Sequence, residues 1–272
     1  MRGTLSIPEE IDEVKAVKLE DAKAFYKNFY GASNGQLAVV GDFDPAEVKK
    51  EIAVQFGEWK SPARFERVKY GFQKIAPVNK TIETPDKQNA VFIAATRLNL
   101  SSQDADYPAL VIGNYMLGGG FLNSRLATRI RVKDGLSYGV GSSVSVKPNE
   151  KDGQFQAFAI AAPQNVSKVE AAFNEEMKRA LADGFTQKEL DDDRTGWLQA
   201  QQVNRSEDGS LVRMLTTRDY DGRTLAWDEG LEKNVIALTP DEIGKAVRRN
   251  IDLAQISIVK AGDFKKAAAA AK

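Results

Sequence analysis

The stretch GGGFLNSRLATRIRVKDGLSYGVGSSVSV, from Gly118 to Val146, carries the most informative pattern in the sequence. Three glycines lead into a segment with three arginines, and a strand-like pattern follows from Tyr138 onward. Leu122, Leu126 and Ile130 are four residues apart, which predicts a short helix that buries one face. At 100° per residue, Arg131 lies about 140° from Leu126 and points away from that apolar stripe.

Each residue of this stretch, taken alone, has a purely structural interpretation. Gly118, Gly119 and Gly120 allow two helices to meet at a sharp angle. Arg131 is then a surface residue, and Tyr138 is a core aromatic residue with a solvated hydroxyl. The glycines do not form a phosphate-binding loop, because no Gly-Lys-Ser/Thr sequence follows them.

Composition excludes several classes of function. The 272 residues predict one large or two smaller cores, and the 38 basic and 38 acidic residues give no net attraction to nucleic acid or anionic membranes. No apolar run approaches the length of a membrane-spanning helix, so no membrane insertion is expected. The chain has no cysteine and no histidine. Ser-His and Cys-His nucleophiles are therefore excluded, and a zinc site in this chain would have only carboxylate ligands. A Ser-Lys dyad and a paired-carboxylate site stay open, although no spacing points to either.

Periodicity and turn residues predict alternating helices and strands. Helices are expected at 19–30, 44–59, 101–120 (ended by its glycines), 163–184, 186–236 and 239–252, and strands at 36–43, 79–84, 89–96, 137–146, 154–162 and 254–264. Asp44 and the Thr186/Glu189 pair are the expected helix caps. Residues 90–98 are apolar on both faces, which is typical of a central strand covered by helices. In the strand expected at 137–146, Tyr138 is expected on the same face as Val140, Val144 and Val146, within an antiparallel hairpin.

An internal repeat relates the two ends of the chain. Residues 19–44 and 239–265 both show an acidic start, an amphipathic helix, a turn, an apolar strand and Gly-Asp-Phe. The repeat predicts two related domains, of which the first lacks most of its strands. Residues 60–75 have no stable period and read as a linker.

The stretch at 118–146 resembles the C-terminal domain of the M16 zinc metallopeptidases, the family of insulinase, pitrilysin and mitochondrial processing peptidase. The resemblance rests on a set of residues that we call the signature: Gly118–Gly120, Ser124-Arg125-Leu126, Arg129, Arg131, Gly135-Leu136-Ser137-Tyr138 and Val140. It extends to residues 29–59, which are similar to the end of the family's metal-binding domain, and to residues 184–199, which are similar to a helix that follows the C-terminal hairpin.

The resemblance implies an α+β fold, with a mostly antiparallel sheet and helices on one face. It implies residues 76–272 as the M16 C-terminal-type domain. Residues 1–75 become the C-terminal remnant of a preceding M16-like domain plus a linker. In the family, an inverted His-x-x-Glu-His motif upstream of this region holds zinc. None of those ligands can be transferred to this chain, so the zinc is expected in a missing or partner domain, and no metal ligand is predicted here.

The resemblance also implies site residues. Arg131 and Tyr138 match an arginine and a tyrosine that lie across the peptide chamber from the zinc, where a guanidinium and a phenol stabilise the charge on the substrate carbonyl oxygen. Gly118, Gly119, Gly120 and Ser137 are expected to line the substrate path.

Two functions of different classes follow from these expectations. The first is the substrate-binding, non-metal-binding part of an M16-type zinc metalloendopeptidase that hydrolyses peptides, with no activity of its own. The second is a catalytically inactive M16-like scaffold or partner subunit. A third possibility is an unrelated α+β binding domain. The expected partners are a peptide or protein substrate and the zinc-binding M16 domain, on the same chain or on a partner subunit. The sequence predicts a soluble protein and does not distinguish periplasm from cytoplasm.

Overall fold

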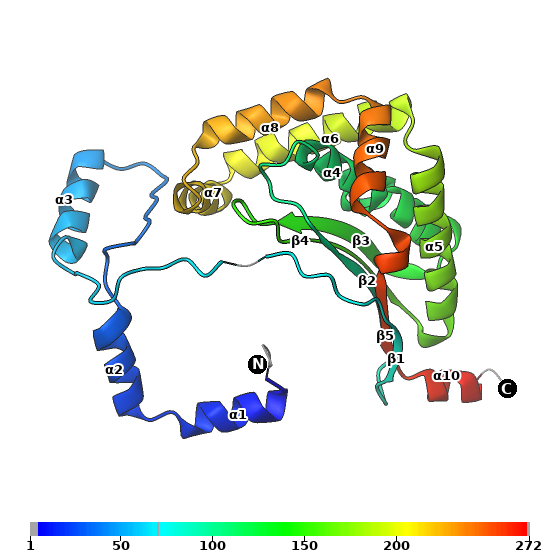
Figure 1. Cartoon of the computed structure of the whole chain (residues 1–272), viewed down its shortest axis with the longest axis horizontal. Helices are drawn as coiled ribbons and strands as arrows, with labels where there is room; N and C mark the ends of the chain where they lie inside the picture. Colours follow the sequence, from blue (N-terminus) through cyan, green and yellow to red (C-terminus); the bar gives the residue numbers. More distant parts are fainter. Residues whose placement is uncertain (1–4, 70, 271–272) are drawn as a thin grey trace.

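A five-stranded sheet organises the chain beyond residue 78 (Figure 1). The computed structural model describes residues 5–69 and 71–270. The strands are β1 (Asn79–Glu83), β2 (Ala90–Leu98), β3 (Ser137–Val146), β4 (Gly153–Ala161) and β5 (Ser257–Gly262), in the order β1-β5-β2-β4-β3. All neighbours are antiparallel except β1 and β5, which run parallel. The predicted mostly antiparallel sheet and the β3–β4 hairpin are confirmed.

The helices that build the core gather on one face of this sheet (Figure 1). The helical elements after β2 are α4 (Tyr107–Asn114), the π-helix η1 (Tyr115–Gly119), the 3-10 helix η2 (Phe121–Asn123), the π-helix η3 (Ala127–Lys133), the 3-10 helix η4 (Pro163–Asn165), α5 (Val166–Asp183), α6 (Gln187–Ser206), α7 (Asp208–Tyr220), α8 (Leu225–Ala237), α9 (Pro240–Asn250), the 3-10 helix η5 (Leu253–Gln255) and α10 (Phe264–Ala270). α4 and α5 contact the strands, and α6, α8 and α9 pack on α4 or α5 or on each other. Buried Phe92, Phe155 and Phe173 lie at the centre of the resulting core. The predicted α+β architecture with helices on one face is confirmed.

The opposite face of the sheet is open, which corrects one prediction. Burial alternates strictly along the first part of β2, so Phe92 is buried while Val91 and Ile93 on the other face are exposed. Phe158 of β4 pairs with Ile93 and is also exposed. β2 is central, as expected, but the helices of the described chain cover only one of its two apolar faces.

The N-terminal helices lie apart from the sheet (Figure 1). They are α1 (Ile7–Ala16), α2 (Leu19–Phe29) and α3 (Pro45–Phe56), and none of them contains a buried residue. Asp44 caps α3 as predicted, and its carboxylate accepts a hydrogen bond from the Ala46 N–H at 2.7 Å. Helix α1 was missed, although Ile7, Ile11 and Val14 have the i, i+4, i+7 spacing of an amphipathic helix and Ser6 and Glu9 form its capping box.

The predicted strand at 36–43 is wrong for this structure. The segment carries no strand assignment. A strand needs neighbours to satisfy its N–H and C=O groups, and no strand pairs with these residues in the described chain. Its counterpart in the repeat, β5, pairs with β1 on one side and β2 on the other. The repeat therefore holds in sequence, while only its second copy has partners here.

The linker is attached to the helical layer at one point. The Arg67 guanidinium donates a hydrogen bond to the Tyr220 carbonyl oxygen at 2.8 Å and lies over the Tyr220 ring, with 4.3 Å between Cζ and the ring centroid. Further along, Phe72 and Ile75 pass the open face of the sheet near Ala95 and Arg97, where they line a cavity of ≈ 520 Å³. Among the described residues, no helix is long and apolar enough to cross a membrane.

Candidate functional site

The three glycines pack the backbone of η1 against its neighbours. A Cβ atom on Gly118 would lie 2.5 Å from the Ser142 Oγ and 2.7 Å from the Ser142 backbone N of β3. A Cβ on Gly119 would lie 2.9 Å from the Asn114 Nδ2, and one on Gly120 would lie 2.9 Å from the Tyr115 carbonyl oxygen. Such contacts are closer than real Cβ atoms make, so glycine is required here for the fold. The predicted role of these glycines in substrate binding stays a prediction.

Replacing Gly118 with alanine is expected to lower the free energy of unfolding by about 1–3 kcal/mol, because the new methyl group collides with the backbone of β3. Gly230 provides the matched control: it lies within α8, and a Cβ there would meet nothing within 4 Å. Gly230→Ala should therefore raise stability by up to about 1 kcal/mol. Urea unfolding of the two variants measures both effects. Equal stabilities would show that η1 does not pack tightly on β3.

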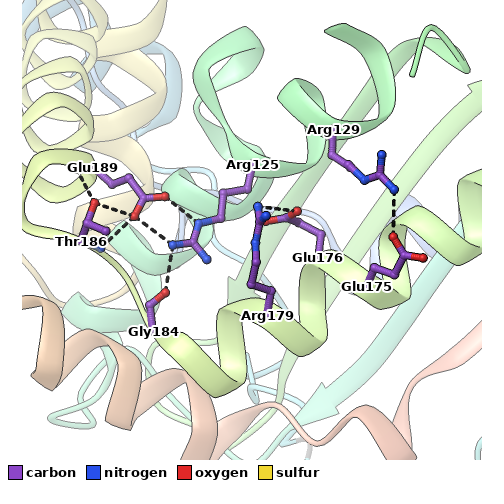
Figure 2. A network of polar contacts seen from close by, with 8 residues as sticks. All are labelled: Arg125, Arg129, Glu175, Glu176, Arg179, Gly184, Thr186 and Glu189. Carbon is purple, nitrogen blue, oxygen red and sulfur yellow. Dashed lines mark hydrogen bonds and ion pairs between the residues drawn. The ribbon is translucent and has the colours of Figure 1, made fainter. Parts of the chain in front are cut away.

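Arg125 fastens the start of η3 to the start of α6 (Figure 2). Its Nε and Nη2 donate to the two carboxylate oxygens of Glu189 at 2.7 and 2.9 Å, and its Nη2 also donates to the Gly184 carbonyl oxygen at 2.9 Å. The guanidinium lies over the Phe185 ring, with 4.7 Å between Cζ and the ring centroid. Glu189 also completes the capping box of α6 through the Thr186 N–H and hydroxyl, which confirms the predicted pair. Arg125, the first arginine of the signature, therefore has a structural role in joining these two segments.

The other two arginines of the signature differ in their contacts. Arg129 donates to Asp134 at 2.5 Å. It also donates to Glu175 on α5 at 2.8 Å (Figure 2). Arg131 is partly exposed and, within the described residues, makes no hydrogen bond or ion pair. The segment is a π-helix, so the angle expected from an α-helix does not apply to it. Leu126 and Ile130 are buried as predicted, but Leu122 is exposed, because it lies in η2 before the helix begins.

A β-bulge at the start of β3 turns Tyr138 away from the sheet. Ser137 pairs with Ala161 and Gly139 pairs with Ile160, so Tyr138 has no partner between them. Its side chain is 59% exposed. The extra residue shifts the alternation, so the expectation that Tyr138 shares a face with Val140 is wrong.

The hydroxyl of Ser137 stabilises this bulge. It accepts a hydrogen bond from the Gly139 N–H at 3.1 Å, and its Oγ lies 2.6 Å from the Ile160 carbonyl oxygen and 2.8 Å from the Gly139 carbonyl oxygen. Ser137 is buried. These contacts give Ser137 a structural role, and its predicted role in substrate binding stays a prediction.

Arg131 and Tyr138 flank a tight connection between η3 and β3. The Leu136 N–H donates to the Ile130 carbonyl oxygen at 2.9 Å and closes this connection, and Gly135 within it has a φ of 60°. The connection has on one side the Arg131 guanidinium, which finds no partner in residues 5–69 and 71–270, and on the other side the exposed Tyr138 phenol. Both groups are free to donate hydrogen bonds to a bound molecule. Their predicted catalytic role stays a prediction.

The described residues do not fit a zinc site. The chain has no histidine or cysteine, and among the described residues no group of three or more Asp or Glu side chains is placed to hold a metal ion. Zinc prefers nitrogen and sulfur ligands in tetrahedral sites, and neither is available here.

A buried carboxylate beside the signature was not anticipated from the sequence. Asp193 on α6 lines a cavity against Leu122, Thr128 and Val132. Burial raises its pKa to about 6, and the charges of Glu189 and Asp192 add to the increase. The Asp191-Asp192-Asp193 run was visible in the sequence, and the available signal was spacing: Asp193 lies three residues after Leu190 and four before Trp197, on the buried side of α6.

Comparisons with known proteins agree with this geometry. Residues 16–196, more than half of the chain, match the family model described as Peptidase M16 inactive domain. A crystal structure of a peptidase M16 inactive domain from Pseudomonas fluorescens superposes with a TM-score of 0.76 at 24% identity, covering 92% of this chain and 59% of that one. A protease from Helicobacter pylori superposes with a TM-score of 0.77 at 16% identity, covering 93% and 60%. The chain belongs to the M16 inactive-domain family.

Curated relatives carry mixed names. An uncharacterized zinc protease of Streptomyces coelicolor is 26% identical over 89% of this chain and 52% of its own length. The probable inactive metalloprotease YmfF of Bacillus subtilis is 27% identical over 52% of this chain and 32% of its own length. The chain thus spans about half, or less, of the curated relatives that it matches.

Proposed function

We propose that this chain is the substrate-binding part of an M16-type zinc metalloendopeptidase that hydrolyses peptides. The zinc belongs to another M16 domain, on the same polypeptide or on a partner subunit. The observation that carries the proposal is that the side chains of Arg131 and Tyr138 are accessible and make no polar contact with the described residues. Arg125, Arg129 and Ser137 make contacts within the fold, whereas among the described residues the partly exposed Arg131 side chain and the exposed Tyr138 side chain have no hydrogen-bond or ion-pair partner.

In this function the two groups act on the substrate carbonyl. Hydrolysis of a peptide bond places negative charge on the carbonyl oxygen. The Arg131 guanidinium and the Tyr138 hydroxyl are both hydrogen-bond donors, and in this proposal both donate to that oxygen as its charge develops.

Residues 1–75 then belong to the neighbouring domain. The apolar residues of α2, including Phe25 and Phe29, are exposed, and so are Leu37 and Val39 of the extended segment. The equivalent residues of α9 and β5 are buried against the rest of their domain. An amphipathic helix with an exposed apolar stripe gains stability only when another surface covers it. The rest of an M16-like domain is that surface in this proposal.

The proposal is tested by comparing two samples against the same set of peptides. Residues 1–272 alone should show no hydrolysis and should bind no stoichiometric zinc in elemental analysis. The same residues joined to, or mixed with, a zinc-binding M16 domain from the same genome should hydrolyse peptides. Hydrolysis by residues 1–272 alone would contradict the proposal.

A second candidate is a catalytically inactive scaffold or partner subunit. Its support is that most of the signature serves packing in this structure, as Arg125 and Gly118 show, and that a relative is named a probable inactive metalloprotease. A complex that forms stably with the zinc-binding domain, yet hydrolyses no peptide, would favour this candidate.

A further inference from the structure

A cavity of ≈ 560 Å³ lies between α6 and the segment that follows the glycines. Glu189, Asp192 and Asp193 line it from α6, and Leu122, Thr128 and Val132 line it from the opposite side. The cavity is separate from the exposed Tyr138 side chain, which does not line it. Three carboxyl groups therefore share one concave surface with apolar walls.

The three carboxyl groups differ in what neutralises them. Glu189 is paired with Arg125, and Asp192 is paired with Lys188 at 2.5 Å. Asp193 is only 9% exposed, and in the described part of the chain it accepts no hydrogen bond and forms no ion pair. Burying a carboxylate without a partner is unfavourable. Among the described residues, the Asp193 carboxylate thus has no ion-pair partner, and it is reachable only from the cavity that it lines.

The dimensions and the walls of the cavity favour an organic cation over a metal ion. Among the described residues, no group of three or more carboxylates is placed to hold a metal ion. The volume is sufficient for a whole side chain, and Leu122 and Val132 offer apolar contact to a methylene stem. Long basic side chains combine such a stem with a charged end.

A strained aromatic residue lies beside the cavity. Phe121 has a φ of 54°, which is rare for a bulky residue, and its side chain is 72% exposed. Val132, on the rim of the cavity, is also exposed at 63%. Exposed apolar residues next to a recessed charge form a surface suited to another polypeptide.

We propose that this cavity binds a lysine or arginine side chain of a polypeptide, with its cationic group on Asp193 and its methylene stem against Leu122 and Val132. Binding replaces the missing counterpart of Asp193 by a charge-assisted hydrogen bond. This site needs neither zinc nor the hydrolysis of a peptide, and so it does not depend on the proposed function.

The test uses residues 1–272 and three blocked tripeptides, Ala-Arg-Ala, Ala-Lys-Ala and Ala-Gln-Ala, titrated at millimolar concentrations with detection by NMR. The two basic peptides should bind about 10- to 100-fold more tightly than the glutamine peptide, which is the range expected for a hydrogen bond between charged groups. Shift changes should concentrate on Leu122, Thr128 and Val132.

Asp193→Asn should reduce binding of the basic peptides to the level of the glutamine peptide. The matched control is Asp191→Asn, which alters a neighbouring exposed carboxylate that is already paired with Arg194, and it should leave binding unchanged. Asp193→Asn should remain folded, because it removes an unfavourable buried charge. Equal binding of all three peptides, or unchanged binding in Asp193→Asn, overturns the proposal.

Two sources of the basic side chain can be separated once the zinc-binding domain is present. If the side chain belongs to a substrate, Asp193→Asn should reduce the preference for cleaving peptides that contain lysine or arginine. If it belongs to the partner domain, the same change should weaken the association between the two domains by a similar 10- to 100-fold.

Discussion

In a protein that joins this chain to a zinc-binding M16 domain, Arg131→Ala is expected to reduce kcat/KM for peptide hydrolysis by about 10²- to 10³-fold, the usual result of losing one oxyanion donor. Tyr138→Phe should have an effect of the same order. The loss should fall mainly on kcat, because the charge on the carbonyl oxygen is greatest in the transition state.

Arg129→Ala is the matched control for this experiment. Arg129 lies two residues earlier in the same π-helix, and it is paired with Asp134 and Glu175 at the surface. Its removal should change kcat/KM by no more than about threefold, because exposed ion pairs contribute little. If kcat/KM is unchanged in both Arg131→Ala and Tyr138→Phe, neither residue takes part in catalysis.

The second large effect is on stability. Arg125→Ala should lower the free energy of unfolding by about 3 kcal/mol, because it leaves the partly buried Glu189 carboxylate without its bidentate partner and removes the contact with Phe185. The Arg125 side chain is 12% exposed, whereas that of Arg129 is 34% exposed. Arg129→Ala should therefore cost less than about 1 kcal/mol in the same urea titration. Similar losses in the free energy of unfolding for both variants would show that burial of the Arg125–Glu189 pair does not increase its contribution to stability.

The same pair gives the stability a defined dependence on pH. Burial opposes ionisation of Glu189, but the hydrogen bonds from Arg125 and Thr186 outweigh it and lower its pKa from 4.5 to about 2. A carboxyl group whose pKa is lower in the folded state stabilises the fold above its unfolded pKa. This contribution should be complete above about pH 4.5 and should be lost as the pH falls toward 2. In Arg125→Ala, thermal unfolding between these pH values should depend less on pH.

The sequence predicted the elements whose signals are local. The Thr186/Glu189 capping box and the hairpin of β3 and β4 depend on neighbouring residues, and the structure confirms both. The failures depend on distant partners. Residues 36–43 have the composition of a strand, but strand formation requires a second backbone that composition cannot supply.

In the candidate site, too, features with local signals were predicted and features that depend on distant partners were not. The sequence indicated which residues to examine, but it did not reveal the bulge that displaces Tyr138, because one extra residue in a ladder is a property of the pairing with β4. Helical spacing does place Asp193 on the same side of α6 as Leu190 and Trp197. The cavity beside Asp193 forms only where residues 122–132 lie against α6, and the spacing within α6 does not determine that packing.

The position of β5 between β1 and β2 has a consequence for biosynthesis. β1 is complete at residue 83, yet its neighbour in the sheet begins at residue 257. During translation, β2, β3 and β4 can assemble before β5 has left the ribosome, and the long sequence separation between β1 and β5 slows closure of the sheet. Until then the edge of β2 is exposed to other nascent chains. Truncation before residue 257 should therefore lead to aggregation rather than to a smaller stable domain.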